Sequence, residues 1–153
     1  MISVAVVLDE KKWSKKIKNK EIFFHKVCKS FPKKYQFLNK KISLTLLLSN
    51  NKSIKKLNKK FRNKNKHTDI LSFPFDAKEK KLKEKYLGDI IISYNYMNKP
   101  RNLSNKQFTE KTVRIFIHGF LHLLGYDHIK NKDYKEMLNE EEKIFKSIKK
   151  LLN

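Results

Sequence analysis

The sequence predicts an α+β fold in which helices cover a small mixed sheet of about four strands. Three observations lead to this prediction. Short runs of β-branched and apolar residues have strand length, longer segments repeat their apolar residues at helical spacing, and the segment 104–125 is so apolar that we expect a central, buried helix. The 153 residues contain no internal repeat and no Gly/Ser linker, so we expect a single domain over residues 1–153.

The first half of the chain alternates strand and helix twice. Residues 2–8 are an apolar, β-branched run typical of a buried strand, and helical spacing follows as far as Pro32. The apolar residues at that spacing are Trp13, Ile17, Phe24, Cys28 and Phe31. Residues 42–48 are the second strand candidate, and residues 49–51 offer caps for a short helix. Three side chains share one face of that helix: Ile54, Leu57 and Phe61.

Two further apolar runs, residues 70–75 and 86–93, predict two more strands joined by a solvated connector rich in Lys and Glu. Gly88 lies inside the second run. Since glycine weakens the interior of a strand, we expect a bulge or a close backbone approach at this position. Asp89 beside it has the character of a solvated strand residue.

Two helices complete the predicted fold. Ser104 followed three residues later by Gln107 is a capping-box pattern that begins the apolar helix, and Gly125 supplies a left-handed residue to end it. An amphipathic helix then follows from about residue 133 to residue 152. Its predicted inner side carries Tyr134, Met137, Leu138, Ile144, Phe145, Ile148 and Leu151.

The composition argues against a membrane or secreted protein. No apolar run approaches the roughly 18 residues of a membrane span, and the longest, residues 1–8, is followed by Asp9 and Glu10 with no cationic stretch before it. Cys28 is the only cysteine, so no internal disulfide ties the fold to an oxidising compartment. We expect a cytoplasmic protein with no membrane partner.

The net charge of +22 favours a polyanionic partner, because cationic surfaces release condensed counterions when they bind a phosphate backbone. The charge is unevenly distributed. Residues 1–66 carry 20 basic and 3 acidic side chains, whereas residues 67–153 carry 17 and 12. The lysine runs at 11–20 and 52–66 are interpreted as a solvated surface whose total charge assists binding, with no role assigned to individual lysines.

Three of the five histidines, His118, His122 and His128, lie within eleven residues. Helical residues four apart share a face, so the first two present their imidazoles to one point. A turn at Gly125 brings the third back toward them. Three neutral imidazoles and an open position are typical of catalytic zinc, whereas a structural site is usually closed by four protein ligands. The sequence therefore predicts one Zn²⁺ per chain at these histidines.

The same spacing occurs in metzincin proteases, but Gly119 stands where those enzymes carry their glutamate. The general base of peptide hydrolysis is thus missing, which disfavours a zinc peptidase-like hydrolase. Asp127 has two interpretations: an acceptor for an imidazole N–H, or a plain turn residue. A non-catalytic RNA-binding factor whose zinc only holds the fold together also stays open.

Because three motifs occur in the expected sequence order, the chain resembles the YbeY family of bacterial rRNA maturation factors, described as zinc-dependent endoribonucleases. The resemblance covers most of the chain and is most specific in HGFLHLLGYDH, residues 118–128. Residues 57–74 and 87–90 also resemble family segments. Two positions depart from the family pattern: Asn65 replaces an expected Asp and His67 an expected Pro.

The resemblance implies an α+β fold, zinc held by His118, His122 and His128, and a role for Arg62 in RNA handling or cleavage. We expect Arg62 and His118 to be the catalytic residues. It implies a single-strand-type endoribonuclease that matures the 3′ end of small-subunit rRNA and acts in ribosome quality control. The implied partners are rRNA, the ribosome or its small subunit, and ribosomal or assembly-factor proteins, with no DNA.

Arg62 is one of only three arginines in a lysine-dominated chain, and a guanidinium suits the charge that builds on a transferring phosphoryl group. The alternative is that Arg62 is a solvated cation just after a helix. Four neighbours also have two interpretations, as cleft-lining residues or as turn-capping and packing residues: Thr68, Asp69, Ser72 and Phe73.

Overall fold

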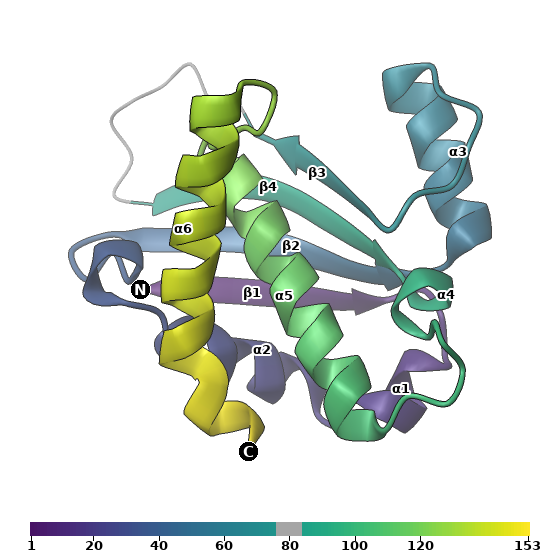
Figure 1. Ribbon diagram of the computed structural model, residues 1–153, viewed down its shortest axis with the longest axis horizontal. Helices are drawn as coiled ribbons and strands as arrows, with labels where there is room; N and C mark the ends of the chain where they lie inside the picture. Colours follow the sequence, from purple (N-terminus) through teal and green to yellow (C-terminus); the bar gives the residue numbers. More distant parts are fainter. Residues whose placement is uncertain (76–83) are drawn as a thin grey trace.

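Four strands form one sheet in the order β1 (Ile2–Leu8), β2 (Lys41–Ser49), β4 (Glu84–Ser93) and β3 (Ile70–Pro74), as Figure 1 shows. The computed structural model describes residues 1–75 and 84–153. The first three strands of that order run parallel, and β3 is antiparallel to β4 at the edge. The predicted mixed sheet is confirmed. The predicted solvated connector falls mainly on residues 76–83, outside the described residues.

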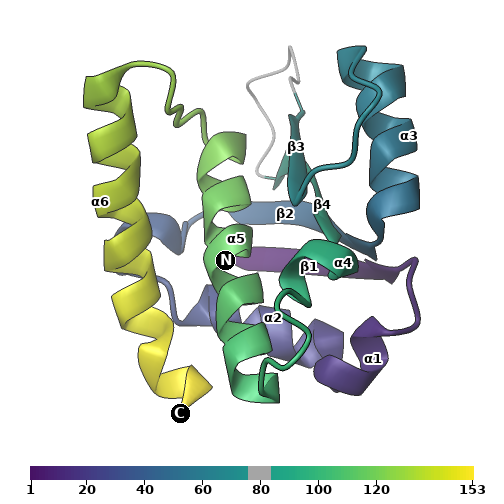
Figure 2. The ribbon, with the colours of Figure 1, turned by 45° about the vertical axis from the view of Figure 1, so that its right-hand side comes forward.

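The helices of the described residues lie on both faces of the sheet (Figures 1 and 2). They are α1 (Trp13–Lys16), α2 (Lys20–Lys29), α3 (Asn51–Arg62), α4 (Tyr94–Met97), α5 (Asn105–Leu123) and α6 (Asn131–Ile148), with short 3₁₀ helices η1 (Lys33–Tyr35) and η2 (Lys149–Leu152). The helices α2, α5 and α6 share a core with one face, and α3 packs on the other. None of these helices combines the length and apolarity needed to cross a membrane.

The apolar helix α5 is central, as predicted, because its side chains fill the space between the sheet and α6. Alternate residues of β2 point toward it and are buried: Ile42, Leu44, Leu46 and Leu48. Phe116, Phe120 and Leu121 of α5 are each 0% exposed. On the opposite face Ile54 of α3 packs in a smaller cluster with Leu71. This burial fixes the position of the C-terminal end of α5.

The helix predicted across residues 13–31 is wrong in one respect, because the structure divides it into α1 and α2. Asn19 has φ 47°, a left-handed conformation that asparagine tolerates better than most residues, and Ile17 is extended. Trp13, Phe24 and Cys28 are nevertheless buried. The apolar spacing therefore predicted burial correctly but not the continuity of the helix.

Gly88 lies at the predicted bulge. The pairing of β2 with β4 shifts register there, and Gly88 has φ 137°. A Cβ at this position would lie 2.1 Å from the carbonyl oxygen of Phe73, so the close approach of β3 requires glycine.

The predicted capping box at Ser104 and Gln107 is confirmed at the start of α5.

The predicted inner side of α6 is correct for its C-terminal part and wrong for its first turns. The buried residues include Met137, Ile144, Phe145 and Ile148. Tyr134 and Leu138 are 51% and 40% exposed, because the start of α6 extends beyond the end of α5 (Figure 2) and both side chains line an open hollow beside His118 rather than the packed core. Phe61, on the predicted apolar face of α3, is 60% exposed, and its ring centre lies 5.5 Å from that of Phe73.

Candidate metal centre

The last two turns of α5 and the turn after it bring three histidines together. His118 and His122 stand one turn apart on α5, and Gly125, with φ 99°, turns the chain back so that His128 lies beside them. Backbone hydrogen bonds hold this turn: the Gly125 N–H donates to the His122 carbonyl at 3.0 Å and the Tyr126 N–H to Leu121 at 3.0 Å. One nitrogen of each imidazole lies within 4.8 Å of the other two.

The geometry of this cluster fits a shared zinc ion. The Nε2 atoms of His118 and His122 lie 3.1 Å apart. Two nitrogens bound tetrahedrally to one Zn²⁺ at about 2.0–2.1 Å would lie about 3.3–3.4 Å apart. No cysteine or carboxylate joins the three histidines in this cluster within the described ranges, so a protein ligand does not close the fourth position. Three imidazoles without a fourth protein ligand are more typical of catalytic than of structural zinc sites.

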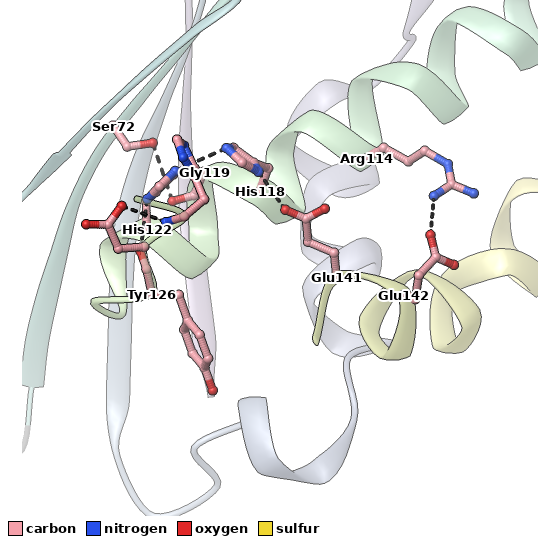
Figure 3. Close-up of polar contacts among 10 residues, drawn as sticks. Ser72, Arg114, His118, Gly119, His122, Tyr126, Glu141 and Glu142 are labelled. Carbon is pink, nitrogen blue, oxygen red and sulfur yellow. Dashed lines mark hydrogen bonds and ion pairs between the residues drawn. The ribbon is translucent and has the colours of Figure 1, made fainter. Parts of the chain in front are cut away.

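Two hydrogen-bond acceptors orient the imidazoles of His118 and His122 on the side away from the cluster, as Figure 3 shows. The Nδ1 atom of His118 lies 2.5 Å from Oε1 of Glu141 on α6, and Nδ1 of His122 lies 2.9 Å from the carbonyl oxygen of Tyr126. Each ring thus donates its Nδ1 proton away from the cluster and keeps Nε2 free to bind a metal. Burial, with the neighbouring His118, lowers the pKa of His122 and favours the neutral, ligating form.

Sequence reasoning missed Glu141, because its 23-residue separation from His118 has no local pattern. For Asp127, the structure favours the second of its two interpretations, that of a turn residue. Its carboxylate accepts the His128 backbone N–H at 2.6 Å, which is the contact of a turn residue rather than of an imidazole acceptor. The carboxylate that supports the histidines therefore comes from α6 and not from the turn that carries them.

Gly119 lies where α5 approaches the sheet most closely. A Cβ there would be 2.7 Å from Cδ1 of Ile70 and 3.1 Å from Oγ of Ser72, whose hydroxyl donates to the Gly119 carbonyl at 3.4 Å. A glutamate at this position would collide with β3 and β4. The structure thus leaves no room for the base that a metzincin peptidase carries here.

A cleft of about 670 Å³ opens beside the cluster, and we call it the histidine cleft. Its walls are the end of α3 and strand β3 on one side and the end of α5 with its following turn on the other. The lining includes Arg62, Lys64, Thr68, Asp69, Ser72, His118, His122, Asp127 and His128. The basic and acidic side chains of this lining balance, so a bound divalent cation would make the cleft positive and suited to phosphate.

Arg62 is the last residue of α3 and faces this cleft. One guanidinium nitrogen donates to the Ser72 carbonyl at 2.8 Å, and the guanidinium carbon lies 5.4 Å from the centre of the Phe73 ring. These contacts fix the head group and leave other N–H donors for a ligand. The structure thus brings together the two sets of residues, Arg62 and the histidines, that lie far apart in the sequence.

Three of the four neighbours of Arg62 combine both of their predicted roles, whereas Phe73 only packs. Asp69 accepts the backbone N–H of Ile70 at 2.8 Å and the hydroxyl of Thr68 at 3.2 Å, so it shapes a turn while its residue also lines the cleft. Ser72 is buried at the contact with α5. Phe73 packs against Phe61, with ring centres 5.5 Å apart, and is absent from the cleft lining.

Comparison with known proteins agrees with this geometry. The family model described as Endoribonuclease YbeY matches residues 7–149. The chain belongs to the YbeY family. The resemblance of its motifs is therefore confirmed over nearly the whole sequence.

Two curated relatives show the extent of this similarity. The endoribonuclease YbeY of Pelagibacter ubique is 62% identical over 149 residues, which is 97% of each chain. That of Persephonella marina is 36% identical over 138 residues, covering 86% of this chain and 90% of the relative. The solution structure of TM1509 from Thermotoga maritima matches with a TM-score of 0.54 and 27% identity, over 97% of this chain and 89% of that one.

The segment after Arg62 departs from the YbeY pattern at His67, yet the structure anchors it. The Nδ1 atom of His67 lies 2.9 Å from the hydroxyl of Tyr96, and the two rings meet edge to face at 5.5 Å. Asn58 of α3 donates to the carbonyl of Lys66 at 2.9 Å. The contact of His67 with Tyr96 and that of Asn58 with Lys66 thus hold the segment after Arg62 in place, at the position where the YbeY family pattern has a proline.

Proposed function

We propose that this protein, a member of the YbeY family of endoribonucleases, cleaves RNA in the histidine cleft with a single Zn²⁺ held by His118, His122 and His128. One observation carries this proposal. The three imidazoles converge from α5 and the turn after it on one side of a cleft, and the other side presents the fixed guanidinium of Arg62. A metal site opposite an arginine is suited to a phosphodiester, whose charge grows during cleavage.

A zinc ion bound here would supply Lewis acidity toward a phosphate oxygen or a bound water of lowered pKa. The residues of the chain provide positioning. Glu141 and the Tyr126 carbonyl hold the His118 and His122 rings in the orientation that exposes Nε2. Arg62 offers its remaining guanidinium donors to the non-bridging oxygens of the phosphate. The contact of His118 Nδ1 with Glu141 fixes this ring, so the catalytic role that we assign to His118 is to hold the metal in a fixed orientation.

The cellular role that we propose is maturation of the 3′ end of small-subunit rRNA and ribosome quality control in the cytoplasm, by one domain spanning residues 1–153. The proposed partners are rRNA, the ribosome or its small subunit, and ribosomal or assembly-factor proteins. The cationic surface supports an RNA partner, because five lysines of α3 lie on the helix that ends at Arg62: Lys52, Lys55, Lys56, Lys59 and Lys60.

Substitution of Arg62 by lysine tests the proposal. Arg62→Lys keeps the unit charge but loses the planar fork that contacts two oxygens at once. Single-turnover cleavage by the zinc-loaded protein should fall about 10²–10³-fold, whereas equilibrium RNA affinity should change little because many cations share it. Arg101→Lys, an exposed arginine outside the histidine cleft, is the matched control and should retain both.

The outcomes of this experiment separate the functions. Equal losses of cleavage and affinity in Arg62→Lys would reduce Arg62 to an ordinary backbone contact. If the folded wild-type protein binds RNA and one zinc but cleaves no RNA, the non-catalytic assembly factor replaces the nuclease. In that case His118→Ala should lower thermal stability and metal content together, with no activity to lose.

A further inference from the structure

Two apolar side chains on α6 are exposed beside the metal centre. Tyr134 and Leu138 stand one helical turn apart and are 51% and 40% exposed, although the chain is otherwise strongly cationic. With Met137 and Glu141 they line a hollow of about 220 Å³, and His118 and His128 form its other wall. We call this hollow the α6 pocket.

The α6 pocket and the histidine cleft meet at the histidines, because His118 and His128 line both. Figure 2 shows why: the C-terminal end of α5 stands between the start of α6 on one side and β3 with α3 on the other. A polynucleotide whose phosphate lies at the histidines and Arg62 therefore has room for an adjoining nucleoside against α6.

The chemistry of the α6 pocket suits an uncharged, flat group rather than a phosphate. No lysine or arginine belongs to its lining among the described residues. Its only carboxylate, that of Glu141, is already paired with His118 at 2.5 Å. What remains is the phenol ring of Tyr134 and the aliphatic side chain of Leu138, while Met137, which also lines the hollow, is 1% exposed. Aromatic rings beside RNA-binding sites commonly stack on unpaired bases.

We propose that Tyr134 and Leu138 form a nucleobase subsite that holds one unpaired base next to the phosphate at the metal centre. The inference rests on the proposed function, since it takes the histidines to bind the phosphate. A base inside a duplex is already paired and stacked and cannot enter the α6 pocket. The subsite therefore selects single-stranded RNA, and Tyr134 is a positioning residue.

A cycle of protein and RNA substitutions tests this subsite. The zinc-loaded protein is titrated with a short single-stranded RNA and with a series of the same RNA in which each position in turn lacks its base. One position should lose about tenfold in affinity, and Tyr134→Ala should lose the same on the intact RNA. Tyr134→Ala on that abasic RNA should show no additional loss, because the same contact is removed twice.

Matched variants isolate the role of the ring. Tyr134→Phe should bind like wild type because it retains the aromatic face. Leu38→Ala is the control for an exposed apolar residue outside both hollows, since Leu38 is 71% exposed, and it should change nothing. Recovery of intact RNA after each titration ensures that binding alone is measured, and circular dichroism checks that each variant is folded.

Two results would overturn the subsite. In the first, the losses from Tyr134→Ala and from the missing base multiply, which means that the ring and the base act independently. In the second, Tyr134→Ala binds and cleaves RNA as wild type does, which leaves the nuclease standing and assigns the apolar surface to another macromolecule. Coupling found in a protein that cleaves no RNA would support the subsite while rejecting the catalytic function.

Discussion

Loss of the Glu141 carboxylate should weaken zinc binding without unfolding the protein. The Glu141→Ala variant leaves Nδ1 of His118 without its acceptor at 2.5 Å, so the ring is free to rotate and to change tautomer. Removal of such an outer partner typically costs 10–100-fold in metal affinity. Because the two side chains are 27% and 24% exposed, water replaces part of the interaction, and we expect a loss of about 10- to 30-fold.

The assay is competition between metal-stripped protein and a chromophoric zinc chelator. Glu142→Ala is the matched control: Glu142 lies on the same helix and pairs with Arg114 at 3.0 Å, away from the histidines (Figure 3). It should keep wild-type affinity, and Glu141→Gln, which retains an oxygen acceptor, should lie between the two. Wild-type affinity in Glu141→Ala, or equal losses in both alanine variants, would refute the reasoning.

Four further outcomes are expected. His122→Ala should lose most of the one equivalent of metal that elemental analysis finds in untagged wild type, and unchanged metal content would contradict the site. Gly119→Ala should lower the free energy of unfolding, measured by urea titration, because its Cβ would lie 2.7 Å from Cδ1 of Ile70 and within 3.2 Å of Ser72 and Ile90, although the higher helix propensity of alanine offsets about 1 kcal/mol of this loss. The hydrogen bond donated by Tyr35, with Lys143 and Lys34, lowers the pKa of the buried Glu140. The ionised Glu140 therefore stabilises the folded state at pH values above the ordinary carboxyl pKa, and this contribution is lost as the pH falls through the lowered pKa. Tyr35→Phe should therefore be less stable than wild type by about 1–3 kcal/mol at pH 7, and the difference should shrink below pH 4; a constant difference would contradict it. RNA affinity should fall steeply between 50 and 200 mM salt, and a flat response would remove counterion release as its source.

Local rules predicted much of this fold because they act within one element. The choice of strand for an apolar, β-branched run and the capping box are decided by near neighbours, which is why residues 2–8 form a strand and Ser104 caps α5 as predicted. The predicted burial of residues 2–8 is wrong in part, because β1 lies at the edge of the sheet and Val7 and Leu8 are 47% and 40% exposed. The same rules failed at Asn19, where the left-handed backbone breaks a helix whose apolar spacing continues. They also failed at Tyr134, where exposure depends on the length of the neighbouring helix.

The candidate site also has some features that the local sequence determines and others that only packing decides. The sequence by itself determined the pairing of His118 with His122, since one helical turn separates them, and the return of His128 after Gly125, since glycine permits the left-handed turn. The tertiary structure alone decided that Glu141 supports the first histidine and that Arg62 faces all three across the histidine cleft. Those contacts join segments far apart in the chain, and they depend on how α5, α6 and α3 pack around one sheet rather than on any local spacing.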